Sequence, residues 1–288
     1  MICQEFDYFA PTTLHDALQL LSDPGARPLA GGMSLVPLMK LRLAAPEKLV
    51  DLRQIPDLRS IRRKDSMLHI GAMATHYEIE SVPLVRSNCP LLAATAAAIG
   101  DVQIRNSGTI GGSVAHADPA ADYPAALLAL EASVQLTGPS GEREMLFEEF
   151  LIDTFTTALE PGELVTAILV PIEEPRSGVY YQKHPQPASG FPMVGVAARL
   201  RLDHGLITFA RVGVTGVSGK GYRARGVEDR LIGKAGSEAD LHDAATVVVT
   251  GVQVNADLHA SANYRSQLAR VATIRALRAS LLKARLPD

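Results

Sequence analysis

The chain has 288 residues, of which 47% are hydrophobic and 20% charged, with a formal net charge of −3. A chain of this length can bury a large core, in one large or two moderate domains. The slightly acidic balance and the lack of a dense Lys/Arg run argue against a nucleic-acid surface. No apolar run reaches the roughly 18 residues of a membrane span, and the N-terminus lacks a secretory leader pattern, so we expect a cytoplasmic protein without a transmembrane segment.

The two cysteines, Cys3 and Cys89, lie far apart and form no CxxC pair. Neither a disulfide framework nor a self-contained zinc or iron–sulfur site is therefore expected, and we predict no metal site on this chain. If the protein works with an iron–sulfur cluster, another chain must carry it.

The first half of the chain alternates short helices and strands. The apolar spacing and the turn residues predict a helix at 14–21 capped by Thr13, a strand at 27–30, a helix at 35–43, a strand at 48–52, two strands within 61–74 and an alanine-rich helix at 91–100 with Gly100 as its C-cap.

The second half reads mainly as strands followed by helices. The sequence predicts a hairpin at 134–144, a strand at 161–172, a domain boundary near Ser177, two long strands on either side of 203–205 and a closing helix at 264–285. No internal repeat is evident, and the fold class is α+β.

Two glycine pairs stand out. Gly31–Gly32 lie between a predicted strand and helix, and Gly111–Gly112 form a second cluster. A backbone without Cβ can approach a phosphate closely and present its N–H groups to it. A tight turn alone would explain an isolated pair, but the nearby hydroxyls of Ser34, Thr109 and Ser113 favour a dinucleotide pyrophosphate held between two loops.

Other chemical motifs are absent. The stretch "GVTGVSGKG" has Val214 where a P-loop needs its first glycine, and no GxGxxG, GxSxG or HExxH pattern occurs. His116 and Asp118 are close in sequence, although local hydrogen bonding explains such neighbours better than acid–base catalysis does. Asp122 can accept from ribose hydroxyls or cap the helix that begins near Pro124. We predict no catalytic residue.

The stretches "AGGMSLVPLMKLRLAAPEKLVDL" (30–52) and "QIRNSGTIGGSVAHADPAADYP" (103–124) resemble the FAD-binding medium subunit of the molybdenum hydroxylases. That family includes carbon monoxide dehydrogenase, quinoline and nicotine-type dehydrogenases and the flavin domain of xanthine dehydrogenase. The resemblance implies a flavin fold of the vanillyl-alcohol oxidase (PCMH) type over residues 1–177, in subdomains of about 1–54 and 55–177. A smaller α+β domain at 178–288 would follow.

The resemblance also implies the FAD contacts. Around the pyrophosphate it places Ala30, Gly31, Gly32, Met33, Ser34 and Leu35 of the first motif, with Thr109, Ile110, Gly111, Gly112 and Ser113 of the second. It puts Asp122 at the ribityl or ribose hydroxyls, Leu164 and Lys183 along the isoalloxazine, and Phe191 where carbon monoxide dehydrogenase relatives have a tyrosine. Met33 replaces a frequent Gln or His, whose hydrogen bonds it cannot make.

The implied function is electron transfer. Substrate would be oxidised at a molybdenum cofactor in a large subunit, and two [2Fe–2S] clusters in a small subunit would pass electrons to FAD in this chain and then to an external acceptor, in a dimer of heterotrimers. Two alternatives stay open: a stand-alone FAD oxidoreductase acting on a small molecule, and a nonenzymatic nucleotide-binding or scaffold subunit. On the closing helix, Arg265, Arg270, Arg275 and Arg278 are expected on a solvated face.

Overall fold

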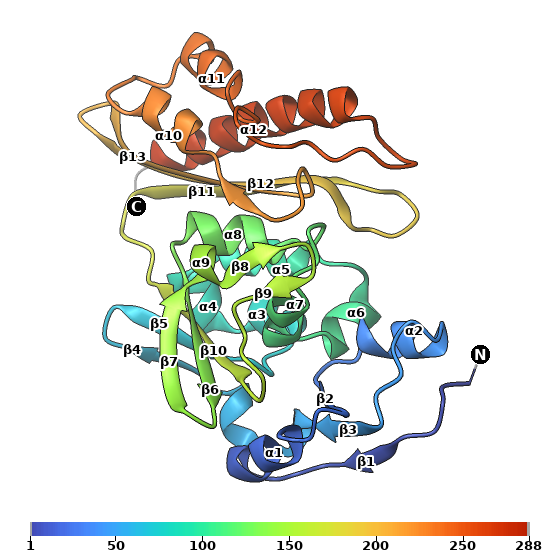
Figure 1. Ribbon diagram of the computed structural model, residues 1–288. Coiled ribbons are helices and arrows are strands. Elements are labelled where there is room, and N and C mark those ends of the chain that lie inside the picture. Colours follow the sequence, from blue (N-terminus) through green and yellow to red (C-terminus); the bar gives the residue numbers. More distant parts are fainter. Residues whose placement is uncertain (1, 287–288) are drawn as a thin grey trace.

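The fold comes from a computed structural model that describes residues 2–286. Figure 1 shows three layers: an N-terminal sheet at the bottom, a central body of sheet and helices, and a C-terminal sheet beneath a long helix at the top. Each layer contributes a cluster of buried apolar side chains, and the central cluster extends into the C-terminal sheet through Val179 and Tyr181.

The N-terminal layer is a three-stranded parallel sheet in the order β1-β3-β2. Its elements are β1 (Asp7–Phe9), α1 (Leu14–Leu21), β2 (Ala26–Leu29), α2 (Leu35–Lys40) and β3 (Lys48–Asp51). The Thr13 hydroxyl accepts from the Asp16 N–H at 3.1 Å, which confirms the predicted cap. The first glycine pair follows β2 directly and precedes α2.

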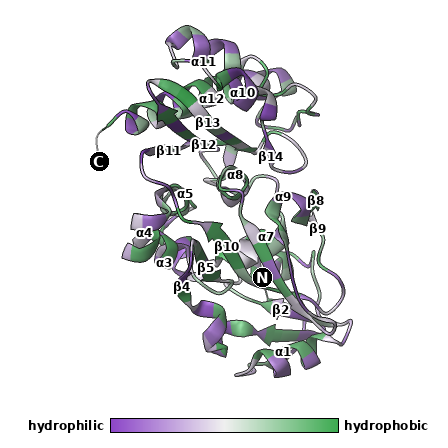
Figure 2. Ribbon diagram, turned by 90° about the vertical axis from the view of Figure 1, so that its left-hand side faces the viewer, coloured by the Kyte–Doolittle hydropathy of each residue, from purple (hydrophilic) through white to green (hydrophobic). Residues whose placement is uncertain are grey.

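The central layer is a five-stranded sheet in the order β4-β5-β10-β6-β7, with antiparallel neighbours. Its strands are β4 (Ile61–Lys64), β5 (Met67–Gly71), β6 (Ser133–Gly138), β7 (Gly141–Leu146) and β10 (Leu164–Pro171), and β8 (Leu151–Asp153) pairs with β9 (Thr156–Thr157). Figure 2 colours β5 and β10 hydrophobic, as their place in the middle of the sheet requires. The predicted hairpins at 61–74 and 134–144 are confirmed.

Seven short helices pack around that sheet. They are α3 (His76–Ser81), α4 (Pro83–Asn88), α5 (Pro90–Ala97), α6 (Val102–Ser107), α7 (Ile110–His116), α8 (Tyr123–Ala129) and α9 (Phe147–Phe150), with 3₁₀ turns at Leu52–Gln54 and Pro56–Arg59. The prediction that Gly100 caps the alanine-rich helix is wrong, because α5 ends at Ala97 with Ala98 as its cap. Gly100 adopts its positive φ of 47° two residues later, in the turn before α6.

The C-terminal layer is an antiparallel sheet in the order β11-β12-β13-β14. It contains β11 (Ser177–Pro185), β12 (Pro192–Asp203), β13 (Leu206–Thr215), β14 (Tyr222–Arg223), α10 (Arg225–Leu231), α11 (Glu238–Ala245) and α12 (Ala262–Ala284). Helix α12 covers one face and α8 the other. Each helix packs so closely on the sheet that a glycine is needed at the contact. A Cβ on Gly178 would lie 1.8 Å from the Ser280 carbonyl oxygen of α12, and a Cβ on Gly213 would lie 2.0 Å from the Ala125 carbonyl oxygen of α8.

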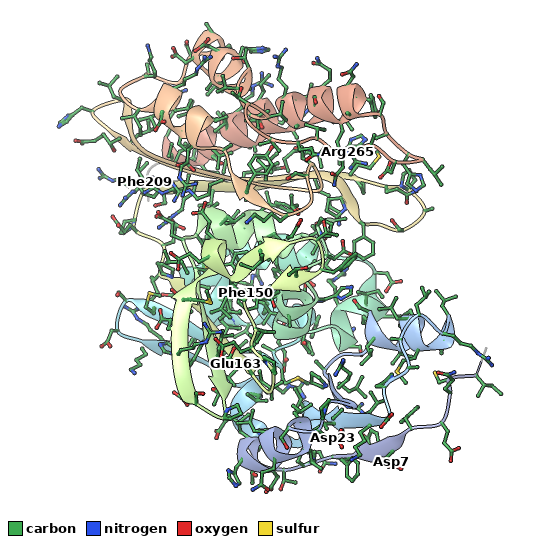
Figure 3. The ribbon with its side chains drawn as sticks, in the orientation of Figure 1. Asp7, Asp23, Phe150, Glu163, Phe209 and Arg265 are labelled. Carbon is green, nitrogen blue, oxygen red and sulfur yellow. The ribbon has the colours of Figure 1, made fainter. Side chains whose placement is uncertain are left out.

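The arginines of α12 do not all lie on a solvated face. Arg265 is 4% exposed on the side of α12 that faces the sheet (Figure 3), and it donates to the carbonyl oxygens of Met193 and Gly216 and to the Asp257 carboxylate. The prediction is therefore wrong for Arg265, because a buried guanidinium can satisfy carbonyls that the sheet leaves unpaired. Arg275 and Arg278 are exposed as predicted.

Candidate functional site

A cavity of about 420 Å³ lies mainly between the loop after β2, the segment from the turn before α6 to α8, and the tip of the β11–β12 hairpin, with His76 of α3 in its wall. Most of the predicted site residues line it, namely Ala30, Gly31, Gly32, Met33, Ser34, Leu35, Thr109, Gly112, Ser113, Asp122 and Phe191. Four predicted residues do not: Ile110, Gly111, Leu164 and Lys183.

The loop after β2 (residues 30–35, hereafter the first loop) presents free backbone donors. Within residues 2–286, the N–H groups of Gly31, Gly32, Met33 and Ser34 donate to no acceptor. Gly31 packs so closely on α6 that a Cβ would lie 2.1 Å from the Ser107 carbonyl oxygen, and the Ser107 hydroxyl donates to the Gly31 carbonyl oxygen at 2.8 Å. Consecutive N–H groups without acceptors beside a cavity can bind an anion.

The segment from Thr109 to Ser113 (hereafter the second loop) comprises the N-cap and the first turn of α7, and its N–H groups at residues 110–113 already have acceptors. Ile110 and Gly111 donate to the carbonyl oxygens of Ala74 and Ala72, at 3.0 and 2.9 Å, and the Gly112 N–H donates to the Thr109 hydroxyl at 3.1 Å. A Cβ on Gly111 would lie 2.4 Å from the Ala72 Cβ. The second loop is therefore fixed to the segment after β5. Three of its residues, Thr109, Gly112 and Ser113, line the cavity.

Asp122 does not cap α8, although it precedes that helix. Its backbone is helical and its side chain makes no capping hydrogen bond. Instead it accepts from the Tyr181 hydroxyl at 2.7 Å and pairs with the Lys183 ammonium at 2.9 Å, while that ammonium also donates to the Ala98 carbonyl oxygen at 2.8 Å. Burial raises the pKa of Asp122 to about 6, against the opposing effects of Lys183 and Tyr181. The carboxylate thus ties the cavity wall to β11.

The remaining predicted residues lie at different distances from the cavity. Leu164 begins β10, belongs to the apolar cluster of the N-terminal layer and lines a separate hollow beside Pro139. Lys183 pairs with Asp122 and does not line the cavity itself. Phe191, 47% exposed, and Met33, 38% exposed, lie at the rim.

His116 and Asp118 both line the cavity but form no acid–base pair in the described part of the chain. The Asp118 carboxylate accepts from the Ala120 N–H at 2.8 Å, and the His116 ring packs against Phe155 with ring centroids 5.0 Å apart. No group of three or more His, Cys, Asp or Glu side chains within residues 2–286 could hold a metal ion.

Sequence reasoning missed His76, a buried residue of the cavity wall. Its Nδ1 lies 3.0 Å from the hydroxyl of fully buried Tyr123. Burial lowers the pKa of His76 to about 4. No local pattern in "ATHYEI" signals this role, because it arises only when the segment after β5 meets the second loop.

Comparison with known proteins matches both parts of the chain to families. Residues 4–173 match the FAD binding domain in molybdopterin dehydrogenase, and residues 179–280 match the CO dehydrogenase flavoprotein C-terminal domain. Among curated relatives, the carbon monoxide dehydrogenase medium chain of Hydrogenophaga pseudoflava is 38% identical over 97% of this chain and 98% of that protein. The 6-hydroxypseudooxynicotine dehydrogenase complex subunit alpha of Paenarthrobacter nicotinovorans is also 38% identical, over 97% and 96%.

Solved structures agree over nearly the full length. Carbon monoxide dehydrogenase from Hydrogenophaga pseudoflava superposes with a TM-score of 0.95 at 38% identity, covering 98% of this chain and 99% of that chain. Quinoline 2-oxidoreductase from Pseudomonas putida 86 gives 0.95 at 32% identity, covering 99% and 100%. No helix within residues 2–286 is long and apolar enough to cross a membrane. The chain belongs to the family of FAD-binding medium subunits of carbon monoxide dehydrogenase-type molybdenum hydroxylases, which are oxidoreductases.

Proposed function

We propose that this chain holds FAD in the cavity between the two loops and relays electrons from a partner subunit to an external acceptor. The partners would be a large subunit with the molybdenum cofactor and a small subunit with two [2Fe–2S] clusters, assembled in the cytoplasm as a dimer of heterotrimers. The observation that carries the proposal is that residues 31–34 line the cavity of a domain from an FAD-binding family, while their four N–H groups have no acceptor within residues 2–286.

The residues of the cavity fit a dinucleotide. A diphosphate needs several donors at one place, and the first loop offers four backbone N–H groups together with the Ser34 hydroxyl, which makes no capping bond to α2. On the opposite wall, Gly112 adds no side chain, and Thr109 and Ser113 each add a hydroxyl group. The diphosphate would therefore lie at the junction of the two loops.

The far side of the cavity is suited to the sugar and ring parts of the cofactor. Asp122 is held by Tyr181 and Lys183, so its orientation is fixed before anything binds. We assign its remaining acceptor capacity to a ribityl or ribose hydroxyl. Phe191 at the hairpin tip offers an apolar surface for the isoalloxazine, whereas we assign Leu164 and Lys183 indirect roles, because neither lines the cavity.

When bound, FAD supplies the redox chemistry, and the protein's part is to bind and orient it. In the part of the chain that the structure describes, His116 and Asp118 do not pair as acid and base, since Asp118 is bonded to the backbone and His116 packs on Phe155. This favours the relay over a stand-alone oxidoreductase. The relatives support a multi-subunit assembly, because they are named as a medium chain and as a subunit of a dehydrogenase complex.

An absorbance spectrum tests the proposal. We would purify the chain alone and together with the products of neighbouring genes, record both spectra, and assay the supernatant of heat-denatured protein for FAD. We expect flavin bands in both preparations, iron–sulfur absorption only in the complex, and bleaching by a reducing substrate only there.

Two results would contradict the proposal. Absence of FAD from both preparations, with no uptake of added FAD, would leave the glycine pairs with a structural role alone. Substrate turnover by the isolated chain would favour the stand-alone oxidoreductase. A first-loop variant, Gly32→Val, is the matched control, because a β-branched residue cannot easily adopt the φ of 72° found there.

A further inference from the structure

His76 is held firmly at the meeting point of the two loops. It is the first residue of α3, whose start is fixed by a capping box between Thr75 and Glu78. The His76 N–H donates to the Gly108 carbonyl oxygen at 3.0 Å, and Thr75 forms a β-bridge with Thr109. The imidazole therefore cannot move independently of the second loop.

The two ring nitrogens have different surroundings. Nδ1 lies 3.0 Å from the Tyr123 hydroxyl. Nε2 lies against Gly108 in the cavity wall, so close that a Cβ on this glycine would be 2.6 Å away. Within residues 2–286, Nε2 has no hydrogen-bond partner, and the Tyr123 hydroxyl has none besides Nδ1.

These contacts determine which nitrogen carries the proton. Burial lowers the pKa of His76 and raises that of Tyr123, so the imidazole is neutral and the phenol keeps its proton. If Nδ1 carried the imidazole proton, the fully buried phenol would have no acceptor, which is costly. The phenol therefore donates to Nδ1, and Nε2 carries the proton.

Nε2–H is also close to the first loop. Gly31 packs on Gly108, where a Cβ of Gly31 would lie 2.7 Å from the Gly108 Cα, and Gly108 in turn contacts Nε2. Gly31 is also the first of the four residues, 31–34, whose N–H groups have no acceptor within residues 2–286, and these residues line the same cavity as His76. Donors from the backbone of one loop and from the ring of His76 thus converge on one region of the cavity.

We propose that His76 Nε2–H donates to a diphosphate oxygen of the bound dinucleotide, and that Tyr123 is a positioning residue which fixes the tautomer. This inference rests on the proposed function and adds a side-chain donor to it. A neutral donor suits this position, because it supplies a hydrogen bond without requiring a charge in a buried wall.

Two substitutions of His76 separate its nitrogens. Asparagine places its amide near the Nδ1 position and keeps a partner for Tyr123, whereas glutamine reaches the Nε2 position. Because a hydrogen bond to a charged oxygen is lost, we expect His76→Asn to weaken FAD binding roughly tenfold to hundredfold. We expect His76→Gln to restore binding to within about threefold of the original chain.

The experiment uses the full chain, stripped of FAD and titrated with FAD while flavin fluorescence is followed. Tyr222→Phe is the matched control, because it removes the hydrogen bond from a half-buried tyrosine to the Val248 carbonyl oxygen in the C-terminal layer. Histidine ¹⁵N NMR of the FAD-free chain reports the tautomer, and ³¹P NMR of bound FAD reports the diphosphate. We expect protonated Nε2, and a ³¹P shift that His76→Asn changes and Tyr222→Phe does not.

Several outcomes would overturn the inference. A protonated Nδ1 contradicts the tautomer, and unchanged FAD affinity with unchanged ³¹P shifts in His76→Asn contradicts the contact. If His76→Asn does not fold, failure of the folded His76→Gln variant to approach the original affinity has the same meaning. If the original chain takes up no FAD, the proposed function falls as well, whereas uptake without any effect at His76 overturns this inference alone.

Discussion

The two loops of the cavity look alike in sequence and differ in what they offer. Both contain a glycine pair and a hydroxyl residue. Within residues 2–286, the N–H groups of residues 31–34 in the first loop have no acceptor, whereas those of residues 110–113 in the second loop are bonded to Ala72, Ala74 and Thr109. A glycine motif therefore does not by itself indicate a backbone that faces a ligand. The partners of each N–H decide whether a loop binds or supports.

The glycines themselves divide in the same way. Gly31 and Gly111 are needed because other atoms occupy the place of a Cβ, and Gly32 because its φ is 72°. Gly112 lines the cavity, and a Cβ there would lie 2.9 Å from the Thr109 hydroxyl. Both interpretations of the glycine pairs are therefore partly right: within each pair, one member is required by packing.

The largest expected effect comes from Gly31→Ala. The new Cβ would lie 2.1 Å from the Ser107 carbonyl oxygen, so one loop must shift, and we expect the free energy of unfolding to fall by about 3 kcal/mol or more. Urea unfolding of the FAD-free chain measures it. Gly112→Ala is the control, because its Cβ meets only the Thr109 hydroxyl, at 2.9 Å, and the Ala30 Cβ. Equal losses of unfolding free energy in both variants would contradict the conclusion that packing requires only one glycine of each pair.

We expect the free energy of unfolding to depend on pH through Asp122, which follows the second loop in the chain. Burial raises the pKa of its carboxyl from the ordinary value of 3.8 to about 6. Its proton is held more tightly in the folded state, so this stabilisation is complete below pH 4 and is lost as the pH rises to about 6. The difference in unfolding free energy between the original chain and Asp122→Asn should fall by at most about 3 kcal/mol over that range. A difference that does not change with pH would refute the assignment.

Local patterns predicted elements better than they predicted contacts. Thr13 at its cap and the hairpin at residues 203–205 were readable, because capping and turn chemistry act within a few residues. The burial of Arg265 and the place of His76 cannot be predicted locally, because their partners Gly216 and Tyr123 lie 49 and 47 residues away. The resemblance supplied the candidate FAD contacts, but sequence alone could not say which amides were already bonded.

Thr109→Val tests whether the second loop stabilises the fold through the Thr109 hydroxyl. The Thr109 hydroxyl accepts from the Gly112 N–H and caps α7, so its loss should lower the free energy of unfolding by about 1 kcal/mol in the FAD-free chain. Thr109→Ser keeps the hydroxyl and should remain within about 0.5 kcal/mol of the original. Thermal and urea unfolding of the three proteins provide the measurement. No loss in Thr109→Val would contradict the capping role, and an equal loss in both variants would mean that the methyl group contributes as much as the cap.

Ser34→Ala should have the smallest effect on stability. Ser34 occupies the position before α2 but its hydroxyl makes no capping bond, so the FAD-free chain should lose no more than about 0.5 kcal/mol. If the first loop binds the diphosphate, the same change should weaken FAD binding by about tenfold or less, since one hydroxyl donor is removed while the backbone donors remain. Fluorescence titration with FAD, beside urea unfolding, measures both quantities. The two variants then distinguish the loops by stability: Thr109→Val should lower the free energy of unfolding, whereas Ser34→Ala should lower FAD affinity at nearly unchanged stability. Unchanged affinity in Ser34→Ala together with a clear loss of stability would mean that residues 31–34 do not mark the binding loop.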